Sequence, residues 1–291
     1  MHNRTKADSE LILNPDGSIY HLNITEKDVA DTVLLVGDQG RVAVVRSFFD
    51  KVDCDVQNRE FHTCTGWYKG RRISAISTGI GTDNIDIVLN ELDAVVNVDF
   101  KTKRPKAQMK SLNIVRIGTS GTLQKDIPVG SYVVSSYAIG FDSLIHFYEM
   151  AYSKREESLM NEIGSLLAHR GITPYAVSGS DQLVQLFSEG MIQGITITAP
   201  GFYAPQGRKI RLQPSIPGLL GDLRNIEFDS LRITNFEMEC SALYALGKLL
   251  GHKTSTCCAI LANRATGDFA GNHDDIIRQL VSEVLEGLVS T

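Results

Sequence analysis

Two carboxylates, Glu237 and Glu239, stand two positions apart in segment 235–240, which reads NFEMEC. A strand-like approach gives way there to a helical pattern, and residues two apart on a strand face the same side. Both acids are therefore expected to point into one space, where like charges are costly to bury unless donors or a ligand meet them. Such a pair could serve as general acid and base, as in glycoside hydrolysis. The alternative is a solvated strand end beside a helix N-terminus, where acids are favoured.

Two apolar strands end in glycine-rich turns, and each turn has an arginine in it or in the strand before it. Residues 33–36 lead into the loop 37–41, GDQGR, and a strand containing Arg116 leads into residues 118–122, GTSGT. Backbone N–H groups at a strand-to-helix turn can bind an anion, and Arg41 could add charge-assisted contacts. A buried Arg116 requires a partner, because an unpaired charge is prohibitive inside a protein. A plain strand-turn-helix connection is the alternative for the first loop.

A third loop, residues 201–208, reads GFYAPQGR and combines an aromatic, an amide and a guanidinium. Its proline and glycines keep it irregular, and its side chains suit a planar polar ligand. Two other chemistries are excluded by spacing. The turn at 77–81 lacks the third glycine of a dinucleotide-binding fingerprint. Ser120 lacks the G-x-S-x-G context of a hydrolase nucleophile.

Composition argues against nucleic-acid-binding, membrane-spanning, secreted and metal-binding proteins. The chain has 291 residues and a formal charge of −5, which argues against a general nucleic-acid binder. No apolar run approaches membrane-spanning length, and the N-terminus lacks the apolar core of a signal peptide. Five cysteines form no C-x-x-C pair, which indicates buried thiols in a reducing cytoplasm. No metal-ligand pattern is present, so no metal site is expected.

Strands alternate with helices along the chain, which predicts an α/β layer sandwich. Residues 1–18 are expected to form a loose lead-in and residues 19–291 a single domain. Residues 99–110, which are rich in lysine and arginine, are expected to be a solvated loop. Helices are predicted at 84–96, after a capping box at 153–156, from residue 181 onward, and at 276–288.

Taken in order, these motifs resemble the nucleoside phosphorylase family over about residues 19–270. The series is His21-Leu22, Gly37-Asp38-x-x-Arg41, Arg59-Glu60-Phe61, Ser77-Thr78-Gly79-Ile80-Gly81, Arg116-Ile117-Gly118-Thr119-x-Gly121, Phe202-Tyr203-x-x-Gln206-x-Arg208, Asn235-x-Glu237-Met238-Glu239 and Asn263-Arg264. The resemblance implies a three-layer α/β/α sandwich with a mixed, partly barrel-like central sheet. It also implies a pentosyltransferase that uses phosphate to cleave uridine reversibly into uracil and ribose 1-phosphate.

The resemblance also implies roles for individual residues. The phosphate-binding set is Gly37, Arg41, Arg59 from a neighbouring subunit, Arg116 and Thr119. The ribose-binding set is His21 across a dimer interface, Glu237, Met238 and Glu239. The base-binding set is Phe202, Gln206, Arg208 and Arg264. The residues expected to carry catalysis are Arg116, Glu239 and Arg208. Neither acid then has to move a proton, because phosphate is the nucleophile and Gln206 and Arg208 serve the leaving base.

Three alternatives remain open: a purine nucleoside phosphorylase, a nucleosidase, and a non-catalytic nucleoside-binding or storage protein. Pyrimidine is favoured because Arg264 stands near the position at which purine-cleaving relatives have an aspartate. Some bacterial members of the family bind a monovalent cation at the dimer interface, through a serine at the position of Asn84 and the glutamate that matches Glu60. Because asparagine replaces that serine here, no cation is expected, and no cofactor is expected beyond the phosphate co-substrate. The expected partners are a nucleoside, phosphate and a second copy of the chain. A homodimer is the minimal unit, and a hexamer is the alternative.

Overall fold

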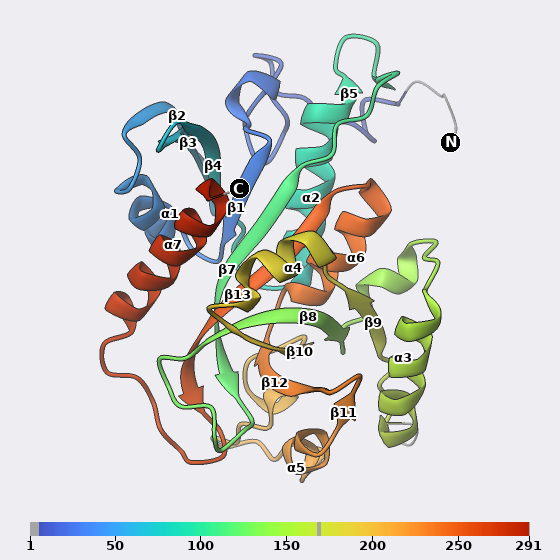
Figure 1. The fold of residues 1–291 in the computed structure, drawn as a ribbon. Helices are drawn as coiled ribbons and strands as arrows, with labels where there is room; N and C mark the ends of the chain where they lie inside the picture. The colour runs from blue at the N-terminus through green and yellow to red at the C-terminus, as the bar shows by residue number, and fades with distance from the viewer. Residues whose placement is uncertain (1–5, 168–169, 291) are drawn as a thin grey trace.

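The computed structural model describes residues 6–167 and 170–290, which form alternating strands and helices around one large sheet (Figure 1). The strands are β1 Thr32–Val36, β2 Lys51–Asn58, β3 Phe61–Tyr68, β4 Arg71–Ser77, β5 Val98–Asp99, β6 Arg104–Pro105, β7 Asn113–Thr122, β8 Tyr132–Gly140, β9 Tyr175–Ser178, β10 Ile192–Thr198, β11 Glu227–Phe228, β12 Leu231–Glu237 and β13 Lys253–Asn263. The α-helices are α1 Gln39–Arg46, α2 Thr82–Asn97, α3 Lys154–Leu167, α4 Asp181–Ser188, α5 Leu219–Arg224, α6 Cys240–Leu250 and α7 His273–Val289. Short 3₁₀ turns lie at Glu26–Asp28, Leu144–Phe147 and Ala204–Gln206.

The sheet is mixed and part of it closes on itself. Its strand order is β11-β12-β10-β8-β13-β7-β1-β4-β3-β2, with β9 paired to β8. An extra antiparallel pairing joins β12 to β7, at Asn235 opposite Thr122 and Phe236 opposite Gly121. The strands β7, β13, β8, β10 and β12 therefore form a closed ring, and β1 to β4 extend from it as an open sheet. The predicted partly barrel-like sheet is confirmed.

Helices cover both faces of the sheet and give it three layers. One apolar cluster joins α1, α4 and α7 to one face, and another joins α2 and α6 to the opposite face (Figure 1). The central strand β1 is buried on both faces, which explains its uninterrupted apolar sequence. The predicted α/β/α sandwich is confirmed, as are the predicted helices.

The N-terminal segment is not loose in its described part. Leu11 and Ile19 belong to the core cluster beneath α2, and the backbone N–H of Lys6 bonds to Lys103 O at 3.0 Å. The first five residues of the expected lead-in 1–18 lie outside the described residues. The segment is ordered because apolar side chains anchor it to α2.

The first part of the basic segment 99–110 forms a short β5–β6 hairpin, the rest has no strand or helix, and most of the segment is exposed as predicted. Three of its four lysines form ion pairs with acids of the N-terminal region: Lys103 with Asp8, Lys106 with Glu26, and Lys110 with Asp31. Much of the positive charge is thus compensated within the chain.

Candidate active site

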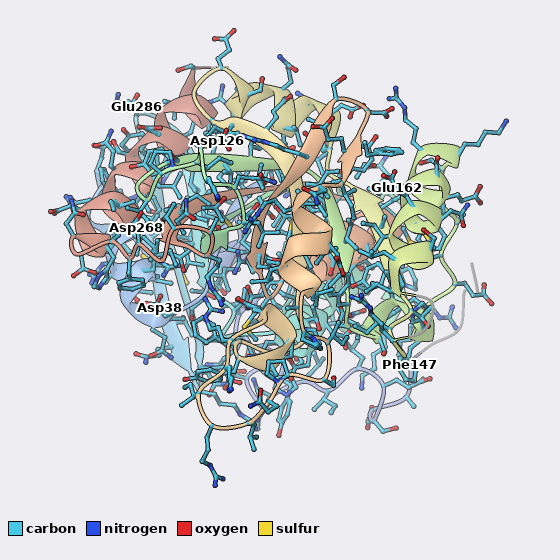
Figure 2. The ribbon with its side chains drawn as sticks, turned by 90° about the horizontal axis from the view of Figure 1, so that it is seen from below. Asp38, Asp126, Phe147, Glu162, Asp268 and Glu286 are labelled. Atoms are coloured by element: carbon cyan, nitrogen blue, oxygen red, sulfur yellow. The ribbon has the colours of Figure 1, made fainter. Side chains whose placement is uncertain are left out.

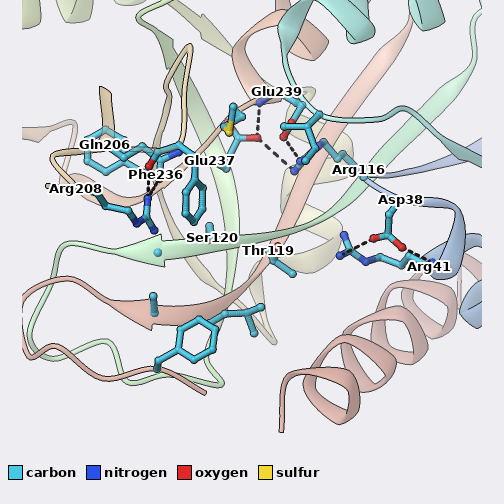
Figure 3. A pocket seen from close by; sticks show the side chains of 18 residues that line it. Asp38, Arg41, Arg116, Thr119, Ser120, Gln206, Arg208, Phe236, Glu237 and Glu239 are labelled. Carbon is cyan, nitrogen blue, oxygen red and sulfur yellow. Dashed lines mark hydrogen bonds and ion pairs between the residues drawn. The ribbon is translucent and has the colours of Figure 1, made fainter. Parts of the chain in front are cut away.

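A cavity of about 350 Å³ opens where β1, β7, β12 and β13 end, a volume suited to a small ligand. Figure 3 shows Arg41 and Arg116 at one end and the amide and guanidinium of the third loop at the other, with Glu237 and Glu239 beside Arg116. The lining residues are Gly37, Asp38, Arg41, Ile80, Arg116, Thr119, Ser120, Gly121, Phe202, Gln206, Arg208, Phe236, Glu237, Met238, Glu239, Leu261, Ala262 and Phe269. Asp38 and Asp268, on loops beside the cavity, lie on one side of the molecule, far from Phe147 and Glu162 (Figure 2).

The loop after β1 prepares one end of the cavity for an anion. Asp38 is the N-cap of α1 and accepts from the backbone N–H of Arg41 at 2.9 Å. The Arg41 guanidinium bonds to Asp38 Oδ2 at 3.1 Å and to Ile117 O at 3.3 Å, which directs it into the cavity. Burial lowers the pKa of Arg41; Asp38 raises it again, and the positive charge of Arg116 lowers it further. Arg41 and Arg116 both line this end of the cavity, and their guanidinium groups can offer charge-assisted hydrogen bonds to an anion.

Arg116 enters the same space from the middle of β7 and is buried. Its Nη1 lies 3.3 Å from Glu237 Oε2, and its Nη2 is ion-paired with Glu239 Oε2. Burial alone would lower the pKa of Arg116, but Glu239 and Glu237 outweigh burial and raise it. Gly118 makes room for this side chain, because a Cβ there would stand 2.1 Å from Arg116 Nη1.

The prediction that a buried Arg116 requires a partner is confirmed, and the structure supplies two carboxylates besides any bound anion. The two acids of the 235–240 segment reach Arg116 directly, because the β12–β7 pairing brings the ends of both strands together. The prediction that both acids point into one space is confirmed.

The two glutamates have different surroundings. Glu237 ends β12 and accepts from the backbone N–H groups of Glu239 and Cys240 and from the Thr198 hydroxyl. Glu239 is the N-cap of α6, and its Oε1 accepts from the backbone N–H of Gly81 at 2.7 Å. Burial raises the pKa of Glu237, against the lowering effect of Arg116.

The third loop forms the opposite end of the cavity. Arg208 donates to Gln206 Oε1 at 2.5 Å and to Phe202 O at 2.7 Å, and its guanidinium lies 3.8 Å from the centre of the Phe202 ring. Gln206 is 3% exposed, and its Nε2 lacks a hydrogen-bond partner among the residues that the structure describes. An aromatic face therefore lies beside an amide donor that needs an acceptor, as a planar polar ring would supply.

Three of the predicted site residues lie outside the cavity lining. Arg264 donates to Gln206 O at 3.1 Å and so supports the third loop from behind. His21 bonds through Nδ1 to Glu91 at 2.6 Å, and Arg59 bonds to the Tyr20 hydroxyl at 3.2 Å. His21 and Arg59 are neighbours at one edge of the molecule, joined through Tyr20, whose ring contacts both.

Several lining residues were missed by sequence reasoning. Phe236, Ile80 and Phe269 supply apolar walls, and the last two are 67% and 70% exposed. Ser120 also lines the cavity, on the face of β7 that carries Arg116. Phe236 and Ile80 lie within two of the motifs quoted above, which could have marked them, whereas Phe269 lies in a loop with no such signal.

Within the part of the chain that the structure describes, no three His, Cys, Asp or Glu side chains are grouped to hold a metal ion. No helix in residues 6–167 or 170–290 combines the length and apolar character needed to cross a membrane.

Comparison with known proteins decides the family. The family model described as Phosphorylase superfamily matches residues 31–290. The chain belongs to this superfamily. A curated uridine phosphorylase from Thermococcus kodakarensis is 31% identical over 260 residues, which cover 87% of this chain and 80% of that protein. A uridine phosphorylase from Haemophilus influenzae is 25% identical over 254 residues, which cover 84% of this chain and 86% of that protein.

A solved structure and a further curated relative also belong to phosphorylases. A nucleoside phosphorylase from Trypanosoma brucei, described as showing uridine phosphorylase activity, superposes with a TM-score of 0.89 at 28% identity, covering 97% of this chain and all of that one. A DeoD-type purine nucleoside phosphorylase from a Thermoanaerobacter species is 34% identical, but over only 40% of this chain and 44% of its own. The resemblance inferred from the sequence is confirmed, and the chain is an enzyme of the nucleoside phosphorylase type, a pentosyltransferase.

Proposed function

We propose that this phosphorylase cleaves uridine with inorganic phosphate and yields uracil and ribose 1-phosphate. The buried Gln206 amide, oriented by Arg208 beside the Phe202 ring, is the observation that carries the choice of a pyrimidine. A uracil ring offers two carbonyl oxygens with an N–H between them, so Gln206 can donate to one oxygen and accept from N3–H. Arg208 can donate to the other oxygen as negative charge develops on the leaving base.

The other end of the cavity is proposed to bind phosphate through the loop at Gly37, the guanidinium groups of Arg41 and Arg116, and Thr119. Phosphate then attacks C1′ of the ribose as the bond to the base breaks. Glu239 holds the sugar hydroxyls, and its negative charge favours an oxocarbenium-like transition state. Met238 forms the apolar floor beneath the sugar. No cofactor beyond the phosphate co-substrate is required by this scheme.

We further propose that a second copy of the chain completes the site. His21 and Arg59 both contact the Tyr20 ring and do not line the cavity of their own chain. An imidazole can hydrogen-bond a sugar hydroxyl, and a guanidinium can bind phosphate. In this proposal both residues act on ligands bound in the cavity of the neighbouring subunit. Arg59 contacts the phosphate there, and His21 contacts the 5′-hydroxyl of the nucleoside.

The test is phosphate-dependent base release from uridine, deoxyuridine, thymidine, inosine and adenosine. The expected result is the highest kcat/KM with uridine and no release without phosphate. Faster cleavage of inosine than of uridine would contradict the pyrimidine assignment and would favour a purine enzyme. A DeoD-type purine nucleoside phosphorylase from Geobacillus stearothermophilus is 26% identical over 85% of this chain. Base release without phosphate would indicate a nucleosidase, and phosphate-independent binding with no turnover would indicate a storage protein.

A further inference from the structure

Glu237 is surrounded by donors from its own chain. Its Oε1 accepts from Thr198 Oγ1 at 2.6 Å and from the Cys240 N–H at 3.0 Å. Its Oε2 accepts from the Glu239 N–H at 2.8 Å and the Cys240 N–H at 2.9 Å, and faces Arg116 Nη1 at 3.3 Å. A carboxylate has about four lone-pair sites. All of them are engaged, so Glu237 has no capacity left for a sugar hydroxyl.

Glu239 differs in this respect. Among the described residues it accepts from the Gly81 N–H through Oε1 and from Arg116 Nη2 through Oε2. About half of its acceptor capacity therefore remains. Since Glu239 also lines the cavity, it can receive both vicinal hydroxyls of a ribose unaided.

Thr198 fixes the orientation of Glu237. The two residues are direct neighbours in the β10–β12 pairing. The Thr198 hydroxyl accepts from the Ser241 N–H at 2.9 Å, which leaves its single hydrogen for Glu237. Ser241 is itself held by Asp142 and Tyr175 through its hydroxyl, at 3.2 and 2.9 Å.

We propose that Glu237, held by Thr198, positions Arg116 for phosphate and does not bind the ribose. Glu237 holds Nη1 of the guanidinium while Glu239 holds Nη2, so the plane of the group is set before any ligand arrives. Partners of this kind tune a binding group without touching the ligand. The inference rests on the proposed phosphorolysis, but it is independent of which base the enzyme accepts.

The chain offers a matched control at Thr196, two residues earlier on β10. Thr196 is also fully buried, and it donates to Asn235, its own neighbour on β12, at 2.9 Å. Thr196→Val and Thr198→Val therefore remove equivalent hydroxyls from one strand, and only the second is linked to Glu237.

The experiment measures steady-state kinetics with phosphate and nucleoside varied separately. Thr198→Val is expected to lower kcat/KM for phosphate at least tenfold while the KM for nucleoside stays within twofold of wild type. Thr198→Ser restores the hydroxyl and is expected to recover phosphate kinetics to within threefold. Thr196→Val is expected to leave both parameters near wild type. An equal loss for Thr196→Val and Thr198→Val, a rise confined to the nucleoside KM, or no recovery by serine would overturn the proposal.

Two further measurements apply if Thr198→Val does not fold or if the wild-type protein shows no phosphorolysis. If Thr198→Val does not fold, Thr198→Cys can replace it; cysteine lacks the threonine methyl group and its thiol is a weaker donor. Phosphate kinetics of Thr198→Cys are expected to be worse than those of Thr198→Ser, and wild-type phosphate kinetics would contradict the role. If wild type shows no phosphorolysis, the proposed function fails, and calorimetric titration with inorganic phosphate still tests positioning. In that titration Thr198→Val must bind phosphate at least tenfold more weakly than Thr196→Val.

Discussion

The guanidinium of Arg208 donates to Gln206 Oε1 at 2.5 Å, and the Gln206 amide nitrogen has no acceptor among the described residues. Leaving a buried donor unsatisfied costs about 1–3 kcal/mol, so this end of the cavity is prepared for a ligand acceptor. The pair is further held from behind by Arg264, through Gln206 O.

Removing the Gln206 amide should damage base recognition and spare phosphate binding. Gln206→Leu keeps a similar volume and is expected to lower kcat/KM for uridine about 100-fold, as for loss of one preorganised donor. The KM for phosphate should change less than twofold. Gln213→Leu, an exposed glutamine in the same stretch of chain, serves as the control. A comparable loss in the control would show that the effect is not one of base recognition.

Removing Arg116 should damage both stability and activity. Arg116→Ala leaves Glu237 and Glu239 buried without their cation, and breaking a buried pair in this way costs about 3–5 kcal/mol. Denaturant unfolding should register that loss, and phosphorolysis should fall below 0.1% of wild type, or about 1000-fold. Arg46→Ala removes an exposed arginine paired with Asp55 and should be nearly neutral in both assays. Near-normal turnover in Arg116→Ala would refute the phosphate role.

The contribution of a neighbouring subunit can be tested by mixing variants. Arg59→Ala and Arg41→Ala should each be nearly inactive, because each removes a phosphate ligand from every site. In a mixed dimer, one of the two sites receives both intact arginines. Co-expression should therefore recover about a quarter of wild-type activity in a random mixture of dimers. No recovery, with mixed dimers demonstrated by two affinity tags, would place Arg59 outside the site.

The thiols should be slow to react in the folded protein. Burial raises the pKa of Cys54 and Cys64 to about 11 and that of Cys258 to about 12. A raised pKa lowers the fraction of reactive thiolate at a given pH. Iodoacetamide at pH 8 should therefore label the native protein slowly, first at the half-buried Cys54, and the rate should rise as the pH approaches 11. All five cysteines should react once the chain is denatured, as mass spectrometry can establish.

Much of the fold could be predicted because local patterns agree with the tertiary structure. The apolar run at 33–36 forms a strand buried on both faces, and the capping box at Ser153 and Glu156 starts α3. The pairing of Arg116 with Glu237 and Glu239 could not be derived from local pattern, because it depends on the β12–β7 contact between distant segments. The sequence showed that Arg116 needed a partner, without showing which residue supplied it.

The walls of the site were harder to predict than its charged groups. Arginines and paired acids in apolar strands are conspicuous, since their burial is costly. Ile80 and Phe269 are exposed apolar side chains in loops, and such residues are common on any protein surface. Their position at the cavity follows from the three-dimensional course of the chain.

The closed ring of five strands also affects when catalytic activity appears during folding. Two residue pairs between β12 and β7 complete the ring, and they join segments more distant along the chain than most sheet contacts. Contacts between distant segments form slowly, because a long loop must close before they stabilise the chain. Activity should thus return after helical circular dichroism during refolding, and a nascent chain that ends before β12 carries Arg116 with neither of its acids.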